Sequence, residues 1–470
     1  MMMKPLKRLS LLVMLCVATS IQAQQDPFWL IHRLGHWWLG VIEEASLPIN
    51  LTFGVADGEL KPFLYSPMQS SEPMIATKWS LDGDTLRINH KETGVRLTLV
   101  WNAADSTFDG TFRQGMLRTK LHLEPTDSLF RLVRPQTPRP PFPYSEQEVT
   151  IVRKKASVTL AGTLTIPEGE GPFPAVVLIS GSGQQNRDEE LMGHKPFLVL
   201  ADWLTRQGIA VLRYDDRGMG GSKGEVTNAT SFDFADDAEA VIDWLRHHPM
   251  VDKRHVGLLG HSEGAMIASV VASRNRHVDF VVFLAGPGTS GADILLQQNT
   301  RIMQLNGVPP MLNDRHTEFL RQVFLRIDTL SPDRYQEAFV ALCDSVAMGL
   351  SADERKQASL RKSDAVALAL QLKNPWFKTF LSFDNSIYLK RMRCPLLAVN
   401  GDLDCQVLPC NLDAIAAATD GRAVVKLMPG LNHLLQHCTS GSTAEYFQID
   451  ETLAPEVLAL VAQWILERVK

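Results

Sequence analysis

Two different patterns of apolar and polar positions divide this chain. Between about residues 37 and 123, short runs alternate apolar with polar residues, and Asp, Gly and Asn separate the runs. Such alternation predicts strands with one buried face, because successive side chains of a strand point to opposite sides. The clearest runs are residues 47–53, 85–89, 96–101 and 119–123. We therefore expect a small antiparallel β domain, a sandwich or a barrel, within residues 24–130.

After about residue 146 the pattern changes to uninterrupted apolar runs separated by helical segments. The apolar runs are residues 175–179, 209–214, 255–259, 280–284, 395–399 and 423–427. Residues 232–246 and 265–273 between them are amphipathic and have the length of crossover helices. Apolar strands that alternate with helices predict a mostly parallel sheet covered on both faces. We place this second domain, of the α/β class, at residues 146–470.

Two segments interrupt this organisation. Closely spaced prolines in residues 131–145 disfavour both helix and sheet, so we expect an extended, stiff linker there. Between the strands that end near residue 285 and begin near residue 395 lies a mostly helical stretch of roughly a hundred residues, longer than an ordinary connection. Because loops at the carboxyl ends of parallel strands border the ligand crevice, we expect residues 287–390 to form a helical cap. The alternative is a helical decoration away from the crevice.

The first residues have the organisation of a secretory signal. Cationic residues at positions 4, 7 and 8 precede an apolar run at residues 11–18, and small residues lead to a cleavage site after Ala23. The run is shorter than the roughly 20 residues that a membrane-spanning helix needs. We therefore expect a signal peptide at residues 1–23, a periplasmic or secreted protein, and no stable membrane span. A membrane anchor and lipid attachment at Cys16 are the alternatives.

The composition narrows the class of partner. The 470 residues are 45% hydrophobic and 21% charged, and the formal net charge is -5. These values are those of a soluble globular protein and give no reason to expect nucleic acid as a partner. Cys405 and Cys410 could form a disulfide, but no Cys/His spacing matches a metal site. Loss of Cys16 with the signal would leave an odd number of cysteines, hence at least one free thiol.

The main chemical signal is the segment Gly-His-Ser-Glu-Gly at residues 260–264. It directly follows an apolar strand and precedes the helical residues 265–270. Such a strand-turn-helix context forms a nucleophile elbow, in which glycines permit the strained turn that exposes the hydroxyl of Ser262. The amide of Glu263 then begins a helix that favours an oxyanion. The second oxyanion donor is expected from the loop after residue 179, at Ser182 or, as the alternative, Gly183.

A serine nucleophile needs a base that is itself oriented by an acid. On the α/β-hydrolase fold these residues follow in the order serine, acid, histidine. Asp402 and Asp404 follow the strand at residues 395–399, and His433 and His437 follow the last strand. The pattern alone leaves both choices open.

Six segments resemble a bacterial α/β-hydrolase carboxylesterase family related to prolyl-oligopeptidase-like and serine-aminopeptidase-like hydrolases. They are residues 181–189, 194–202, 213–222, 260–264, 400–407 and 430–433, and the resemblance covers about residues 146–470. It implies Asp404 as the acid and His433 as the base. A looser resemblance at residues 65–70 and 112–115 implies a β-rich accessory domain before the hydrolase domain.

These observations lead to one expected function. We expect a serine carboxylesterase that hydrolyses small or short-chain acyl esters through an acyl-enzyme, without a metal or organic cofactor. Trp376 and Phe377 are candidates for the substrate pocket, or else they pack the cap. The alternatives are a serine peptidase of the same fold and a non-catalytic relative that only binds a ligand.

Several other conspicuous residues are expected to have structural roles. Asp215, Asp216 and Arg217 follow a predicted strand and can brace the neighbouring loops by charge-assisted hydrogen bonds. His261, next to the nucleophile, is expected to pack or donate hydrogen bonds and not to act as a second base.

Overall fold

The computed structural model describes residues 37–42, 47–66, 73–115, 117–130, 132 and 134–469. The predicted signal peptide lies outside these residues. The chain forms two compact units that divide between residues 132 and 133, and each unit is described by itself.

The first unit is one curled antiparallel sheet of nine described strands, in the order β4-β3-β2-β1-β9-β8-β7-β6-β5. The alternation is clearest in β7, where every second side chain is buried. Trp38, Leu51, Leu99 and Phe108 are among the side chains that form its apolar core. The strands are β1 (Trp37–Ile42), β2 (Leu47–Ala56), β3 (Glu59–Tyr65), β4 (Met74–Ile75), β5 (Lys78–Asp82), β6 (Thr85–His90), β7 (Val95–Asn102), β8 (Thr107–Gln114) and β9 (Leu117–Thr126).

The second unit is built on an eight-stranded sheet in the order β10-β11-β13-β12-β14-β15-β16-β17. The strands from β12 to β17 pair in parallel, and β10 and β11 are antiparallel at one edge. The uninterrupted apolar runs are therefore the parallel strands, as the sequence predicts, and they are largely buried except for the edge strand β17, which is partly exposed. The strands are β10 (Ser145–Arg153), β11 (Val158–Ile166), β12 (Phe173–Ile179), β13 (Ala210–Tyr214), β14 (Val251–His261), β15 (Val281–Leu284), β16 (Leu396–Gly401) and β17 (Val424–Met428).

Helices cover both faces of this sheet, and each face has its own apolar core. Helices α4 (Ser231–Leu245), α5 (Glu263–Arg274), α12 (Asn385–Arg391) and α13 (Cys410–Ala418) supply apolar side chains to one core. Helices α3 (Pro196–Arg206) and α14 (Pro455–Leu466) supply the other. This three-layer arrangement of a mainly parallel sheet is the α/β-hydrolase fold with the predicted order of elements.

The strand order reverses at β12, and this reversal positions the site. Strand β12 lies between β13 and β14, so the chain leaves β12 toward one side of the sheet and returns on the other. Ile179 at the end of β12 pairs with Gly260 at the end of β14, which places the two following loops at the same edge. Ligands bind at such switch points, outside the carboxyl ends of the strands.

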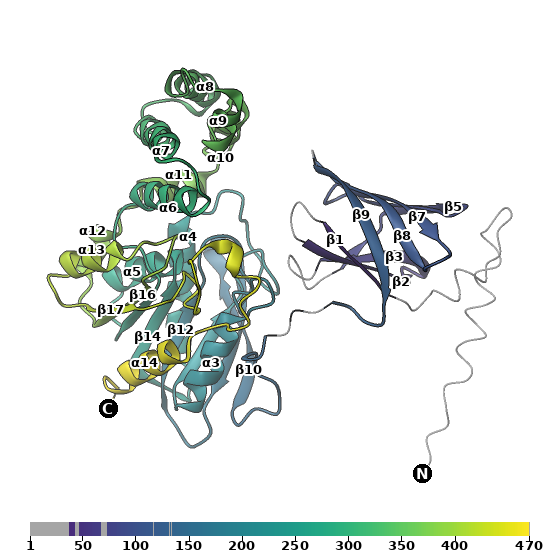
Figure 1. Cartoon of the computed structure of the whole chain (residues 1–470). Helices are drawn as coiled ribbons and strands as arrows, with labels where there is room; N and C mark the ends of the chain where they lie inside the picture. Colours follow the sequence, from purple (N-terminus) through teal and green to yellow (C-terminus); the bar gives the residue numbers. More distant parts are fainter. Residues whose placement is uncertain are drawn as a thin grey trace, which may run out of the picture. The chain divides into compact units, whose positions relative to one another are not determined.

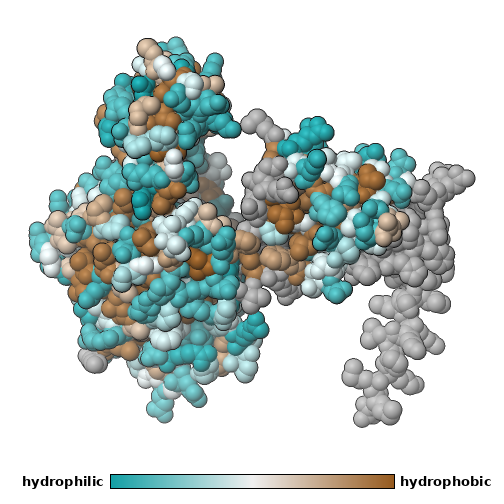
Figure 2. Space-filling model, in the orientation of Figure 1, coloured by the Kyte–Doolittle hydropathy of each residue, from teal (hydrophilic) through white to brown (hydrophobic). Residues whose placement is uncertain are grey.

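Helices α6 to α11 form a cap whose core is separate from those of the sheet. Apolar side chains of α7, α8 and α10 gather inside it, among them Phe319, Tyr335 and Phe339. Figure 1 shows these helices together at one end of the sheet. On the face of the molecule shown in Figure 2, the outer surface of the cap is largely hydrophilic. The helices are α6 (Gly291–Leu305), α7 (Pro310–Phe324), α8 (Tyr335–Val346), α9 (Ala352–Gln357), α10 (Lys362–Gln371) and α11 (Pro375–Ser382).

The proline-rich segment, which the sequence predicts to be an extended linker, is bound to the hydrolase unit from residue 134 onward. The guanidinium of Arg134 is buried and donates to the carbonyl oxygens of Met192, Phe447 and Ile449. The side chain of Gln136 also donates to the carbonyl oxygen of Leu453, at 2.7 Å. Residues from 134 onward therefore belong to the hydrolase unit, because buried hydrogen bonds outweigh the extended preference of the prolines.

Two further observations concern the predictions on cysteines and membranes. Cys405 and Cys410 are both free, as are the other three cysteines of the described chain. No helix within the described ranges has the length and apolar character required to cross a bilayer.

Candidate functional site

Ser262 occupies a strained turn between β14 and α5. Its backbone has φ 53° and ψ -121°, a conformation that residues other than glycine rarely adopt. The flanking glycines allow the turn to close. A Cβ at Gly260 would lie 2.1 Å from the carbonyl oxygen of Gly264, and a Cβ at Gly264 would lie 2.1 Å from that of Ile179. The Gly-His-Ser-Glu-Gly segment thus presents the serine hydroxyl at the carboxyl edge of the sheet.

The structure brings His433 and Asp404 to this hydroxyl. Nε2 of His433 lies 3.1 Å from Oγ of Ser262, and Nδ1 lies 2.8 Å from Oδ2 of Asp404. Both the carboxylate and the imidazole are buried, with 2% and 4% of the residue exposed. The other carboxylate oxygen accepts the backbone amides of Gln406 and Val407, at 2.8 and 2.9 Å. An imidazole held in this way can take a proton from the hydroxyl while the carboxylate stabilises the resulting charge.

The two alternative residues lie elsewhere. Oδ1 of Asp402 accepts the amide of Gly430 at 2.6 Å and so supports the turn before the histidine loop. His437 is half exposed and contacts Glu451 and Glu456, at 2.9 and 3.0 Å. Of each pair, only Asp404 and His433 belong to the hydrogen-bond chain that ends at Ser262.

The proposed oxyanion donors lie beside the serine. The amide of Glu263 opens helix α5, where the first N–H groups have no partner within the helix. Ser182 follows Gly181, whose added Cβ would lie 3.2 Å from Cβ of Ser262. Ser182 and Glu263 line the cavity at the nucleophile, whereas Gly183 is not among the lining residues. Of the two candidates for the second donor, only Ser182 lines the cavity.

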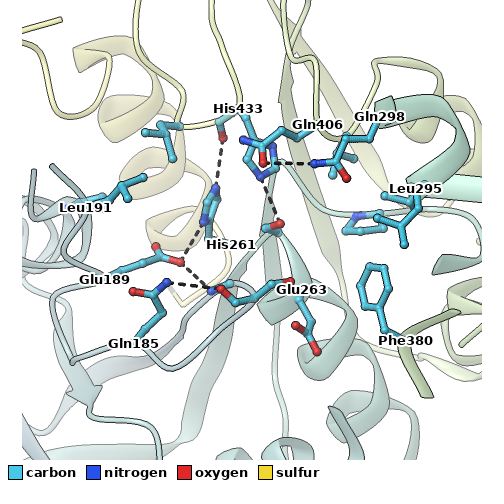
Figure 3. A pocket seen from close by; sticks show the side chains of 18 of the residues that line it. Gln185, Glu189, Leu191, His261, Glu263, Leu295, Gln298, Phe380, Gln406 and His433 are labelled. Carbon is cyan, nitrogen blue, oxygen red and sulfur yellow. Dashed lines mark hydrogen bonds and ion pairs between the residues drawn. The ribbon is translucent and has the colours of Figure 1, made fainter. Parts of the chain in front are cut away.

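A cavity of about 280 Å³ opens at Ser262 between the sheet edge and the cap. Trp376 and Phe377 of helix α11 line it, as does Phe380, which the sequence reasoning did not single out. The rings of Trp376 and Phe380 stack with centroids 5.5 Å apart. Figure 3 shows Phe380 and Leu295 on one side of His261 and Glu189 and Leu191 on the other. No cluster of three or more potential metal ligands occurs in the part of the chain that the structure describes.

The side chain of Glu263 joins the cap to the nucleophile elbow. It is buried and accepts hydrogen bonds from the hydroxyl of Ser231 at 2.6 Å and from Nε1 of Trp376 at 2.9 Å. Burial raises the pKa of this carboxyl, although hydrogen bonds from Ser231, Trp376 and Ser182 oppose the shift. The contact anchors helix α11 above Ser262, so Trp376 has both a structural contact and a place in the cavity wall.

The expected bracing residues support the loops on either side of the serine. Arg187 binds both carboxylate oxygens of Asp215, at 3.1 and 2.9 Å, and Arg217 binds Asp237 at 2.6 Å. The carboxyl of Asp216 accepts the amide of Gln185, and burial raises its pKa to about 7. The contacts of Asp215 and Asp216 hold the loop that carries Ser182, and Arg217 joins the loop after β13 to helix α4.

His261, which the sequence predicts to pack or to form hydrogen bonds, connects the two loops that flank the nucleophile. Its Nδ1 lies 2.9 Å from Oε1 of Glu189, and its Nε2 lies 3.1 Å from the carbonyl oxygen of His433. The same glutamate oxygen accepts the amide of Gly181 at 2.6 Å. A carboxylate and a carbonyl can only accept hydrogen bonds, so both ring nitrogens of His261 must carry protons. His261 is therefore a charged bridge between the loop of Ser182 and the loop of His433.

This bridge predicts a pH-dependent contribution to stability. Burial alone would lower the pKa of His261, but the charge and hydrogen bond of Glu189, the carbonyl of His433 and the charge of Asp404 raise it above 6.5. The stabilisation is therefore fully present below about pH 6.5 and is lost as the pH rises through the folded-state pKa. We expect the Tm advantage of the wild type over His261→Gln to shrink as the pH increases from 6 to 9.

Thermal unfolding of both proteins across this pH range measures the difference. His122 also has a raised pKa, beside Asp109, but both proteins retain it and its contribution cancels. Glu189→Gln should reduce the same pH dependence, because it removes the carboxylate charge. A Tm difference that stays constant or grows with pH would contradict a charged His261.

The fold and the serine at its elbow define the class of this protein as an α/β hydrolase. The chain belongs to the X-Pro dipeptidyl-peptidase (S15) family, whose model matches residues 156–428. The family and the relatives below indicate that it is a serine hydrolase.

Similar proteins have several activities. The chain is 26% identical over 329 residues to the esterase EstD of Thermotoga maritima, which covers 70% of this chain and 69% of that protein. It is 26% identical over 152 residues to the peroxisomal succinyl-coenzyme A thioesterase of Mus musculus, covering 32% and 31% of the two chains. A solved esterase of Pyrococcus furiosus is 17% identical with a TM-score of 0.40, covering 69% of this chain and 93% of that one.

Proposed function

We propose that this protein is a serine carboxylesterase that hydrolyses short-chain esters of small molecules through Ser262, His433 and Asp404. The observation that supports the proposal most directly is the hydrogen-bond chain from Oγ of Ser262 through the imidazole to the buried carboxylate. The similarity to an esterase over most of the chain points to the same bond type.

In the proposed mechanism, Oγ of Ser262 forms a bond to the carbonyl carbon of the ester while Nε2 of His433 takes the hydroxyl proton. The amides of Ser182 and Glu263 stabilise the negative charge that develops on the carbonyl oxygen. When the tetrahedral intermediate collapses, the carbon–oxygen bond to the alcohol breaks and the alcohol leaves with the proton from His433. Water then attacks the acyl-enzyme by the same route and releases the acid.

The family match also favours a second candidate, a peptidase that removes dipeptides ending in proline. Such an enzyme has to bind the ammonium group of a peptide amino terminus, for which an available carboxylate is the natural partner. Two carboxylates line the described cavity, Glu189 and Glu263. The first binds His261 and the amide of Gly181, and the second accepts hydrogen bonds from Ser231 and Trp376. Because both carboxylates already have partners, neither is available to bind a peptide amino terminus. This favours an ester over a peptide as the substrate.

Active-site labelling together with a direct comparison of substrates tests the proposal. A fluorophosphonate probe should modify Ser262, as located by peptide mapping, and kcat/KM should be higher for 4-nitrophenyl butyrate than for glycyl-prolyl-4-nitroanilide. Labelling should be lost in His433→Gln and retained in His437→Gln, because only the first histidine contacts the serine. Modification at another residue would refute the assignment of the nucleophile. Faster turnover of the anilide would favour the peptidase.

We further propose that the enzyme acts outside the cytoplasm, in the periplasm or the medium. The support is the succession of cationic, apolar and small residues up to Ala23, which lie outside the described residues.

A further inference from the structure

The cavity at Ser262 has a polar wall that is joined to the histidine side of the site. Nε2 of Gln298, on cap helix α6, donates to Oε1 of Gln406 at 3.4 Å, and Nε2 of Gln406 donates to Oη of Tyr446 at 2.8 Å. The backbone amide of Gln406 also donates to Asp404, the partner of His433. Gln298, Gln406 and His433 all line the cavity, and Figure 3 labels all three. The pair is therefore linked to the imidazole that faces the serine through the backbone of Gln406 and the carboxylate of Asp404.

A second, apolar wall is joined to the residue that carries the proposed oxyanion donor. Trp376 and Phe380 stack there, and Leu295 lines the same part of the cavity. Trp376 is held by the side chain of Glu263, whose backbone amide is the proposed oxyanion donor. The apolar wall thus adjoins the oxyanion donors, and the carboxamide pair adjoins the imidazole.

The proposed reaction assigns one part of the ester to each wall. The oxygen of the leaving alcohol must come within hydrogen-bond distance of Nε2 of His433, because this atom returns the proton to it. The carbonyl oxygen must point at the amide of Glu263. An ester placed in this way brings its alcohol to the side of His433, where Gln406 and Gln298 line the cavity, and leaves the apolar lining of Trp376, Phe380 and Leu295 for its acyl group.

We infer that Gln298 and Gln406 form a subsite for an uncharged alcohol that carries additional hydroxyl groups, a polyol or a sugar. The inference rests on the proposed esterase function. Gln406 is held between two partners, whereas Oε1 of Gln298 accepts no hydrogen bond from the described chain and remains available. A carboxamide both donates and accepts, which matches a hydroxyl group. None of the described lining residues is Lys or Arg, and the charged His261 is already paired with Glu189, so an anionic alcohol would meet no unpaired cation there.

Three butyrate esters that differ only in the alcohol test the subsite. Methyl butyrate has no further hydroxyl group, and the monobutyrates of glycerol and of glucose supply a polyol and a sugar. We expect the wild type to prefer at least one of the two hydroxylated esters. Gln298→Leu, which removes the carboxamide at similar size, should lower kcat/KM for that ester about five- to tenfold and change that for methyl butyrate less than about twofold.

Two further variants distinguish binding of the alcohol by Gln298 from a general effect on activity. Gln297→Leu changes the neighbouring residue on helix α6, which is outside the cavity lining, and should leave all three values unchanged. Leu295→Ala, on the apolar wall, should lower kcat/KM for the three butyrates by the same factor.

Two results would overturn the subsite alone. One is an equal loss for all three esters in Gln298→Leu, and the other is turnover of methyl butyrate by the wild type without preference for a hydroxylated alcohol. Failure of the wild type to hydrolyse any ester would overturn the proposed function and the subsite with it.

Discussion

Replacement of Ser262 by alanine is expected to lower kcat for 4-nitrophenyl butyrate by at least about 10⁴-fold, because among the described residues only the Ser262 hydroxyl is hydrogen-bonded to Nε2 of His433. The strained backbone at this position is held by close packing around Gly260 and Gly264, so the variant should keep its fold and its Tm should change little. Steady-state assays of the purified protein, together with probe labelling, measure the loss of kcat.

A matched control lies on the same helix. The hydroxyl of Ser273 donates to the carbonyl oxygen of Val270, at 2.7 Å, far along α5 from the elbow. Ser273→Ala should therefore retain activity within about twofold. If Ser262→Ala retained ester hydrolysis and probe labelling while folded, another residue would have to be the nucleophile.

Asp404→Asn is expected to lower kcat by about 10⁴-fold while leaving the fold intact. Oδ1 of Asp404 accepts two backbone amides, so the oxygen of an asparagine must occupy this position. The amide nitrogen then faces Nδ1 of His433, where Oδ2 lies in the native protein. Because that nitrogen can only donate, the imidazole must carry its proton on Nε2 and cannot accept the proton of Ser262.

Asp402→Asn is the control for this change. Asp402 lies two residues earlier in the same loop and supports the turn at Gly430 with one oxygen, a contact that asparagine can keep. Its kcat should stay within a few-fold of the wild type, as measured with the same ester. Equal losses in the two variants would show that the loop, and not the carboxylate at position 404, sets the activity.

Much of the fold follows from local pattern. Alternation at residues 96–101 predicts a strand with one buried face, and β7 has this burial. Uninterrupted apolar runs predict the buried parallel strands, and a helical insertion predicts the cap of α6 to α11. The linker is the exception, since nothing near Arg134 in the sequence indicates that its guanidinium binds carbonyl oxygens of residues 192, 447 and 449.

The candidate site, like the fold, could be predicted from local sequence only in part. The Gly-His-Ser-Glu-Gly segment indicates Ser262 because the elbow is formed by five consecutive residues in a recognisable strand-helix context. The pattern left Asp402 with Asp404 and His433 with His437 as equal choices, and family resemblance favoured the pair that the structure brings to the serine.

By itself, the sequence determined the α/β-hydrolase class and the β domain, and it indicated the proposed nucleophile. Short-range backbone geometry sets the period of strands and helices and the shape of a tight turn, so neighbouring residues carry that information. Only the tertiary structure showed that His261 bridges Glu189 to His433, and that Glu263 holds Trp376 of the cap, 113 positions away. Such contacts form because long loops bring distant residues to the same edge of the sheet. No local sequence pattern indicates the course of these loops.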